Sequence, residues 1–104
     1  MNTKELLSRY MAGQRDFRNL NLMAANLRSF NLSGINLSGA NLTKANLTKA
    51  NLSHANLTDV KLIGANLTET NLIKANLTNA DLSDTNLSDA NLGQTSLQGT
   101  MKKE

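Results

Sequence analysis

The sequence predicts an all-β solenoid of square coils with a short helix at its N-terminal end, and three observations support this. Leu or Phe recurs at every fifth residue from Phe17 to Leu97. The residue before it is Asn or a near substitute, and the residue two before it is mostly small and apolar. Ser or Thr usually follows. The unit therefore reads Ala-Asn-Leu-[Ser/Thr]-x and recurs between residues 15 and 99.

A five-residue period fits neither an ordinary helix nor an ordinary strand. An α-helix repeats every 3.6 residues, so this period would spread the leucines around the whole cylinder. A strand alternates its side chains, so an odd period would send successive leucines to opposite faces. A chain that turns by about 90° every five residues instead points each leucine to one axis, and residues twenty apart stack. Successive coils would lie at the strand spacing of about 4.8 Å.

Composition excludes several classes of protein. The 104 residues include no Cys, no Pro and only three aromatic side chains. Without Cys there are no disulfides, no thiolate metal sites and no thiol catalysis. No apolar run approaches the roughly 20 residues of a membrane span, and the N-terminal segment lacks the apolar core and cleavage site of a signal peptide. We therefore expect a single domain without a membrane anchor, located in the cytoplasm.

Residues 3–12 are predicted to form the helix. Asn2 or Thr3 can cap its N-terminus, and Gly13 suits the position after its C-terminus. The apolar side chains fall on one face, namely Leu6, Leu7, Tyr10 and Met11. Because a helix this short is marginal alone, we expect that face to cover the first coil. The predicted division is a cap helix at 1–14, a β-helix at 15–100 and a tail at 101–104.

The repeats at 40–44, 45–49 and 50–54 read Ala-Asn-Leu-Thr-Lys twice and Ala-Asn-Leu-Ser-His, and they closely resemble the pentapeptide-repeat family. The resemblance covers residues 15 to 99. It implies a right-handed quadrilateral β-helix, of about four coils at this length. Residues 5–17 look like the N-terminal cap helix of cyanobacterial members. The resemblance to those members suggests a regulatory or stress-related role.

Most residue types in the repeat have a structural interpretation. Asn side chains are expected to bond local turn backbone, and the following Ser or Thr likewise. The position two before leucine, or its equivalent at the end of the array, is large in several early repeats and Thr in several late ones (Leu20, Phe30 and Ile35; Thr85, Thr95 and Thr100). The large side chains are expected to fill the first coil beneath the helix, and the late threonines suggest a looser, more solvated end.

The charged side chains are polarised along the chain. Residues 1–61 carry a net charge of +5 and residues 62–101 a net charge of −3. The register of twenty would place Lys49 beside Glu69 and Lys61 beside Asp81, and such pairs are worth about 0.2–1 kcal/mol each. Two interpretations stay open, namely charge compensation with solubility, and an electrostatic interaction surface.

The sequence contains no arrangement typical of an enzyme. His54 is the single histidine and falls at the outermost position of its repeat, and no nucleophile is paired with a base. Three carboxylates near the C-terminus, Asp81, Asp84 and Asp89, would point outward along different sides, which disfavours a Ca²⁺ site. We therefore predict no catalytic residue, no cofactor, no metal and no small-molecule substrate.

The predicted function is a non-enzymatic scaffold that contacts a protein partner. Its contacts are expected where the repeat is broken, at Arg18, Arg28, Lys61, Ile63 and Ile73. The alternative is DNA mimicry toward gyrase or topoisomerase, as in some members of the resembled family. Those members carry strongly acidic surfaces, which the net charge of +3 does not match. Direct nucleic-acid binding is also disfavoured, because no basic stripe is interleaved with aromatic residues.

The C-terminal end of the predicted solenoid has no evident cap. An uncovered last coil exposes leucine and unpaired backbone groups, which invite pairing with another chain. The sequence therefore predicts either a tail-to-tail homodimer or a monomer whose tail folds over the end.

Overall fold

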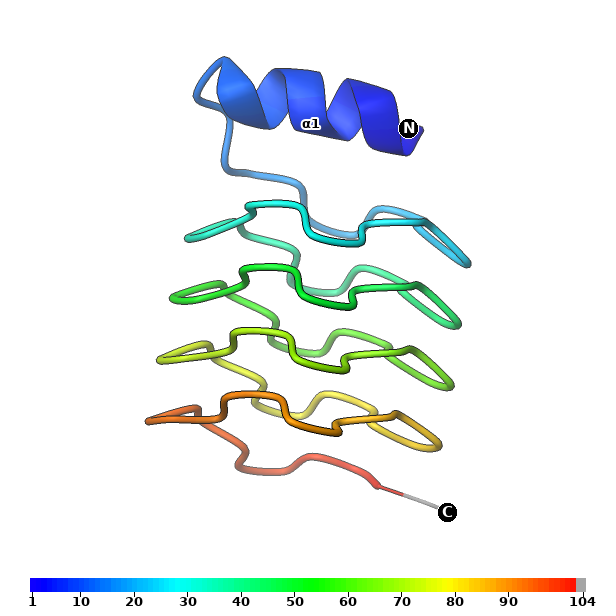
Figure 1. Ribbon diagram of the computed structural model, residues 1–104, viewed down its shortest axis with the longest axis vertical. Coiled ribbons are helices and arrows are strands. Elements are labelled where there is room, and N and C mark those ends of the chain that lie inside the picture. Colours follow the sequence, from blue (N-terminus) through cyan, green and yellow to red (C-terminus); the bar gives the residue numbers. More distant parts are fainter. Residues whose placement is uncertain (103–104) are drawn as a thin grey trace.

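The computed structural model describes residues 1–102 as a stack of coils with one helix across its N-terminal end. Figure 1 shows α1 (Thr3–Met11) above the coils and the C-terminal residues at the opposite end. The molecule measures 35 × 25 × 22 Å along its principal axes. Residues 103 and 104, which belong to the predicted tail at 101–104, lie outside the described residues.

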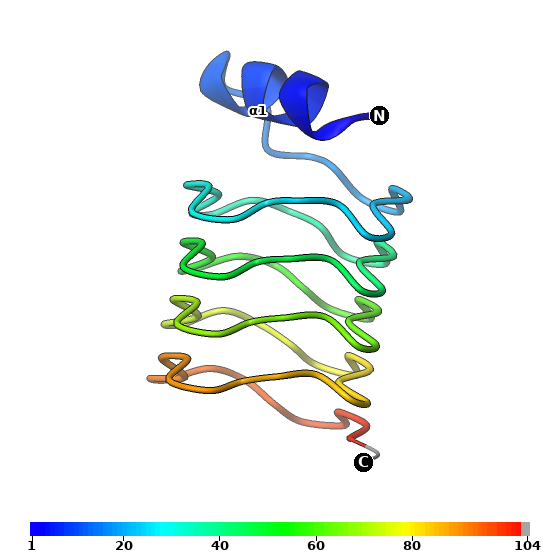
Figure 2. The same cartoon turned by 45° about the vertical axis from the view of Figure 1, so that its right-hand side comes forward.

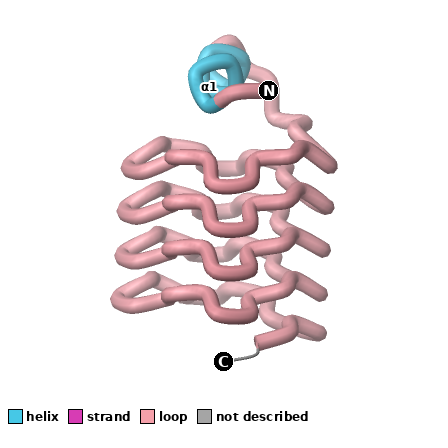
Figure 3. The backbone as a smooth tube through the Cα atoms, turned by 90° about the vertical axis from the view of Figure 1, so that its right-hand side faces the viewer, coloured by secondary structure: helices cyan, strands magenta, loops and turns pink. Residues whose placement is uncertain are grey.

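Parallel backbone bridges between residues twenty apart hold the coils together. Each bridge is isolated rather than part of a longer strand, because the chain turns again within five residues. Figures 2 and 3 show the coils stacked in register beneath the helix. The predicted register of twenty is confirmed by bridges that run from Asp16 with Asn36 to Asp81 with Met101.

The inner repeats of the stack use their backbone hydrogen bonds in the same way. The Leu57 N–H donates to the carbonyl of Asn76 in the next coil at 2.8 Å, and the Leu57 carbonyl accepts the Val60 N–H at 3.1 Å, which closes a turn. Inside that turn Asp59 has a φ of 60°. Gly34, at the equivalent place, has a φ of 71°, which glycine adopts without steric cost. The predicted turn within each five-residue unit is therefore present.

Columns of leucine fill the interior. Leu37, Leu57 and Leu77 lie twenty residues apart and are fully buried, whereas Leu97 at the end of the same column is 40% exposed. Burying one such side chain contributes about 1.5–3 kcal/mol. Of the large residues predicted to fill the first coil, Ile35 is fully buried, and the other two are partly buried against the core.

The threonines two before leucine make specific bonds to the preceding coil. Thr85 is 8% exposed, and its hydroxyl donates to the carbonyl of Leu62 at 2.7 Å. Thr95 makes the equivalent bond to Leu72 at 2.6 Å. The prediction of a solvated environment is therefore wrong for Thr85, because the preceding coil provides a carbonyl acceptor within reach of a hydroxyl at this position.

Helix α1 begins at the predicted residue and ends one residue earlier than predicted. The Asn2 side chain accepts the N–H of Glu5 at 2.8 Å, which satisfies one of the free N–H groups of the first turn. Gly13 follows the helix with a φ of 105°, and its N–H donates to the carbonyl of Tyr10 at 2.9 Å. Both predicted ends of the helix thus have the expected chemistry.

The apolar face of α1 packs on the first coil through two side chains. Leu6 is fully buried and Tyr10 is 8% exposed. The Tyr10 hydroxyl donates to the carbonyl of Ser33 at 2.6 Å. One coil later the carbonyl of Ser53 accepts a backbone N–H instead, so Tyr10 replaces a missing coil at this point. The prediction that Met11 shares the buried face is wrong. It is 77% exposed, because one residue along a helix rotates by about 100°.

Candidate functional site

In most repeats the side chain before the leucine hydrogen-bonds within its own repeat. The Asn41 side-chain oxygen accepts the backbone N–H of Thr43 at 3.0 Å and the Thr43 hydroxyl at 2.6 Å. The predicted turn role of Asn is confirmed. The threonine hydroxyl, however, bonds the Asn side chain rather than the backbone in this and similar repeats. The side-chain oxygen of Asn is therefore already paired within its own repeat in these units.

The fourth residue of the unit Asn-Leu-[Ser/Thr]-x carries most of the displayed charge. These residues have positive φ values close to 60° and their side chains are exposed; they include Lys44, Lys49, His54, Asp59, Glu69, Lys74, Asp84 and Asp89. Among residues 1–102, the charged side chains are exposed except for the half-buried Asp81. The outer surface of the coils is thus where this chain can recognise anything charged.

The five predicted contact residues do not form one patch. The register of twenty places Arg18, Arg28 and Ile73 in three different columns of repeats. Lys61 and Ile63 share a single repeat and form a fourth position. The arginines and Lys61 are exposed and the isoleucines are half-buried. Only the Lys61–Ile63 pair can therefore meet one partner group at the same point.

Arg18 already forms an ion pair with a neighbouring carboxylate. Its Nε donates to Asp16 Oδ1 at 2.9 Å and its Nη2 to Asp16 Oδ2 at 3.0 Å. These hydrogen bonds from Arg18 lower the pKa of the Asp16 carboxyl below its usual range. Because both groups are exposed, the pair stays in contact with water. The charge of Arg18 is largely compensated within the chain.

The repeat at Lys61 lacks a hydrogen bond that its neighbours make. In each other repeat from residue 16 to residue 93, an Asn or Asp oxygen accepts the N–H two residues later. Lysine has no acceptor atom, so the N–H of Ile63 receives no such partner. Lys61 still pairs through its backbone with Asn41 and Asp81. The break therefore changes the surface and leaves the coil intact.

The predicted ion pair between coils at Lys49 and Glu69 is not formed. The two residues are in register, since the bridge of Asn46 with Asn66 lies beside them. Within the described part of the chain, ion pairs link Arg9 with Glu5 and Arg18 with Asp16, and none links Lys49 with Glu69. Both members are displayed to solvent, where such a pair gains little. These charges remain available to a partner.

Arg15 holds the helix to the first coil, a role that sequence reasoning missed. Its guanidinium carbon lies 3.7 Å from the centre of the Tyr10 ring, in a cation–π contact. The same side chain donates to the carbonyls of Tyr10 and Gln14, both at 2.9 Å. Its five-residue spacing from an aromatic residue at a helix end is a signal that could have indicated this packing.

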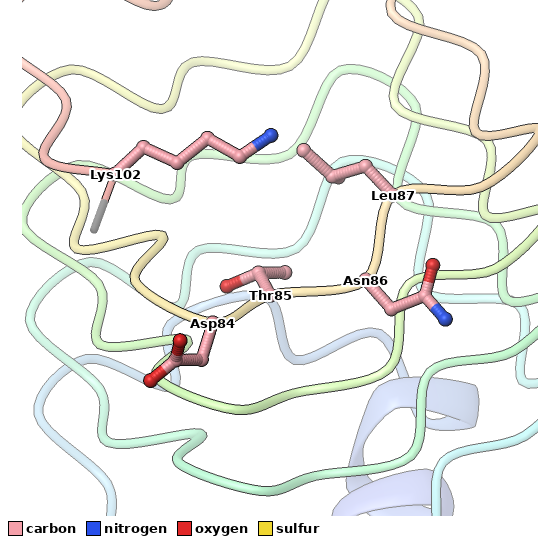
Figure 4. A pocket seen from close by; sticks show the side chains of 5 residues that line it. All are labelled: Asp84, Thr85, Asn86, Leu87 and Lys102. Atoms are coloured by element: carbon pink, nitrogen blue, oxygen red, sulfur yellow. The ribbon is translucent and has the colours of Figure 1, made fainter. Parts of the chain in front are cut away.

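Two open hollows lie at the ends of the molecule. One, of about 520 Å³, lies between α1 and the first coil; its lining includes Arg9, Gln14, Asp16, Arg18 and Asn19. The other, of about 400 Å³, lies in the last coil (Figure 4), where the Lys102 side chain extends toward Leu87; Asp84, Thr85 and Asn86 complete the lining. Both are shallow and open to solvent, so neither resembles a substrate pocket.

No three His, Cys, Asp or Glu side chains among residues 1–102 lie closely enough together to hold a metal ion. In the same range, α1 is too short and too polar to cross a membrane, and no other helix is present.

A filled apolar axis and outward polar repeats define this chain as a solenoid repeat protein. Its family follows from the repeat itself. A family model for pentapeptide repeats matches residues 21–59 and 61–99 in eight copies. The chain therefore belongs to the pentapeptide repeat family. Among curated proteins, no significant match to the chain is found.

Solved structures of the same family superpose well on the chain. A pentapeptide repeat protein of the cyanobacterium Cyanothece 51142 matches with a TM-score of 0.85 and 40% identity over 86% of this chain and 60% of that one. HetL of Nostoc sp. strain PCC 7120, described as involved in heterocyst differentiation regulation, matches with a TM-score of 0.73 and 37% identity over 96% and 46%.

A pentapeptide repeat protein of the Arabidopsis thaliana thylakoid lumen matches with a TM-score of 0.67 and 32% identity, over 83% of this chain and 57% of that one. The chain thus spans less than two thirds of the length of each of these three proteins.

Proposed function

We propose that this chain is a non-enzymatic scaffold that presents its outer surface to a protein partner. The observation that supports this best is the separation of charge from core. Among residues 1–102 three threonines are buried, and the Asp, Glu, Lys, Arg and His side chains are exposed except for the half-buried Asp81. A general acid or base is commonly tuned by burial and by close charged neighbours. In this chain the charged groups instead lie where they can contact a binding partner.

The finer architecture belongs to the same proposal. A right-handed, four-sided β-helix of about four coils agrees with a twenty-residue register in which four pentapeptides make one turn. The proposed division keeps residues 1–14 as a cap helix and residues 15–100 as the β-helix. We also propose that the protein works in the cytoplasm. The proposed contact residues remain Arg18, Arg28, Lys61, Ile63 and Ile73.

Affinity capture from a native lysate of the source organism tests the scaffold. The expected result is a protein retained by the wild-type chain and lost from a variant whose lysines at 44, 49, 61 and 74 are replaced by glutamine. The purified complex should then re-form from its two components. The proposal would be contradicted if the variant captured the same protein as the wild-type chain, or if the purified chain turned over a substrate.

A tail-to-tail homodimer is part of the proposed assembly. Leu97 is 40% exposed and Met101 is 56% exposed, and Leu87 and Leu92 are only partly buried. Covering these side chains with a second copy would remove apolar surface from water. Sedimentation velocity measures this directly, and a sharp monomer at high protein concentration would reject the dimer.

The topoisomerase alternative requires a surface like that of DNA, with a high density of negative charge. The first 61 residues carry a net charge of +5 instead, which argues against that role. A gyrase supercoiling assay separates the two functions. Inhibition of supercoiling, or protection of gyrase from a quinolone, would favour the alternative over the scaffold.

A further inference from the structure

The repeat at Lys61 lacks a stabilising hydrogen bond that the neighbouring repeats form. An intramolecular hydrogen bond contributes about 0.5–1.5 kcal/mol net. Asn is the residue found at the equivalent place in most repeats, and it would form the bond without other change. A regular array that departs from its own best residue at one place often marks a functional position. The unpaired group is the backbone N–H of Ile63.

That N–H is reachable from outside the coil. In the neighbouring repeats the acceptor arrives from the surface, as the Asn41 oxygen does at the N–H of Thr43. At Ile63 no oxygen of the described chain occupies that place. Lys61 is exposed, so its long side chain can move aside while its ammonium group stays close. An external acceptor can therefore bind where the amide oxygen of Asn normally sits.

A second lysine lies directly beside this position. The backbone N–H of Lys44 donates to the carbonyl of Ile63 at 2.8 Å. The Lys44 side chain lies against Gly64, because a side-chain carbon built on this glycine would lie 3.5 Å from the Cγ of Lys44. The Lys44 stem thus passes over Gly64. Lys44 and Lys61 thus belong to two stacked repeats, and the free N–H of Ile63 lies in the second of them.

We define the Lys61 face as residues 21–24, 41–44, 61–64 and 81–84, which three bridges stack in one column. Its first three repeats carry Lys44 and Lys61 with no acidic residue. Apolar side chains flank the lysines, since Met23 is 53% exposed and Ile63 is half-buried. The face therefore combines two lysines, a hydrogen-bond donor and apolar contacts in its first three repeats, while its fourth repeat, in the coil after Lys61, carries Asp81 and Asp84.

We propose that the Lys61 face binds an acidic segment of a protein partner, with one Asp or Glu carboxylate accepting the Ile63 N–H between Lys44 and Lys61. A carboxylate matches all three groups, because it accepts several hydrogen bonds and pairs with cations. The carboxylate takes the place of the missing Asn oxygen. This inference rests on the proposed scaffold function and specifies the surface and the chemistry of its partner.

The test is a selection of random twelve-residue peptides against the wild-type chain, followed by affinity measurements. Selected peptides should contain Asp or Glu, and changing the essential acid to its amide should weaken binding at least 10-fold. Lys61→Asn should weaken binding to the same extent. It should also raise the thermal midpoint by about 2–6 °C, because the added Asn oxygen accepts the Ile63 N–H. A folded, stabilised variant that loses binding excludes unfolding as the cause.

Two further variants separate charge from hydrogen bonding. Lys61→Met removes the charge and leaves the N–H free, so it should weaken binding without raising the thermal midpoint. Lys74→Asn removes a lysine from another column and should change affinity less than 2-fold. In the amide spectrum of the wild-type protein, the Ile63 N–H should move downfield when a selected peptide binds.

Three outcomes overturn the proposal. Selected peptides could lack acidic residues, Lys61→Asn could bind them as tightly as wild type, or the Ile63 amide could be unaffected by binding. In each case the scaffold function still stands if the lysate partner is captured. If neither peptides nor a lysate protein bind the folded chain, the scaffold function fails together with the Lys61 face.

Discussion

The leucine columns allow the stability of the solenoid to be tested within one set of equivalent residues. Leu57→Ala and Leu97→Ala remove the same atoms from the same column. Leu57 is fully buried, and Leu97 is 40% exposed at the end of the column. The two residues occupy the same position of the repeat, and they differ in the following coil, which pairs with the repeat of Leu57 and not, among the described residues, with that of Leu97.

The expected losses follow from the geometry around each leucine. The Leu37 N–H donates to the Asn56 carbonyl at 2.9 Å, and the Leu57 N–H donates to the Asn76 carbonyl at 2.8 Å. These bonds fix the spacing of the coils on either side of Leu57, so the surrounding residues cannot move in to fill the cavity that the substitution leaves. A buried Leu→Ala change at such a site costs about 3–5 kcal/mol. At Leu97 the loss should be about 1–2 kcal/mol, because part of the side chain is already in water.

Urea denaturation followed by circular dichroism measures both losses. The midpoint of Leu57→Ala should fall well below that of Leu97→Ala, with similar m-values. In a thermal scan the Leu57→Ala midpoint should drop by more than about 10 °C. Equal losses for the two variants would refute the reasoning, because they would mean that the last coil is as well covered as the inner ones.

Three smaller predictions concern the ends and turns. Tyr10→Phe should cost about 0.5–1.5 kcal/mol in a urea titration, since it removes the hydroxyl bond from the cap helix to the first coil; an unchanged midpoint would show that this bond contributes nothing. Gly39→Ala should destabilise more than Gly34→Ala, because both glycines have a positive φ but only the new carbon at Gly39 would overlap the Oδ1 of Asn19, whose side chain would have to move. Equal midpoints would contradict this. Arg18 lowers the pKa of Asp16, so the small contribution of this carboxylate to folding stability should be complete above about pH 4 and lost as the pH falls further. Asp16→Asn should remove this part of the pH dependence of stability. An unchanged loss of stability at acidic pH in that variant would be evidence against it.

Sequence reasoning predicted the architecture because the five-residue period fits neither helix nor strand. The period alone placed each leucine inward and fixed the register of twenty. It also identified the turn role of Asn, because Asn bonds nearby backbone by a local mechanism that requires no knowledge of the coils above or below. Local rules were sufficient wherever the partner atoms lie within the same repeat.

Contacts between coils were harder to predict. The bond from Thr85 to Leu62 spans two residues far apart in sequence, so a threonine among alanines suggested water rather than a buried acceptor. Arg15 was counted as a surface charge, although its guanidinium packs on Tyr10. In each case the decisive neighbour comes from another element, and periodicity does not indicate which side chains meet there.

The candidate contact residues illustrate the same limit. The sequence singled out Lys61 and Ile63 because they break the repeat. It did not show that the break leaves a backbone N–H without its usual acceptor, because that follows only from comparing the hydrogen bonds of neighbouring repeats. It also did not show that Arg18 is already paired with Asp16 at 2.9 Å.

The Asn side chain that closes each turn has a consequence for the choice of expression host. Asn-Leu-[Ser/Thr] is also the acceptor tripeptide of N-linked glycosylation, and the chain contains nine of them, at Asn31, Asn36, Asn41, Asn46, Asn51, Asn56, Asn66, Asn76 and Asn86. In a eukaryotic secretory pathway, glycans would be attached before the coils close. Coils stacked about 4.8 Å apart leave no room for a glycan on every level of a column. Secreted expression should therefore yield misfolded glycoprotein, and these Asn positions would need replacement by Asp, which accepts the same turn hydrogen bond at Asp81.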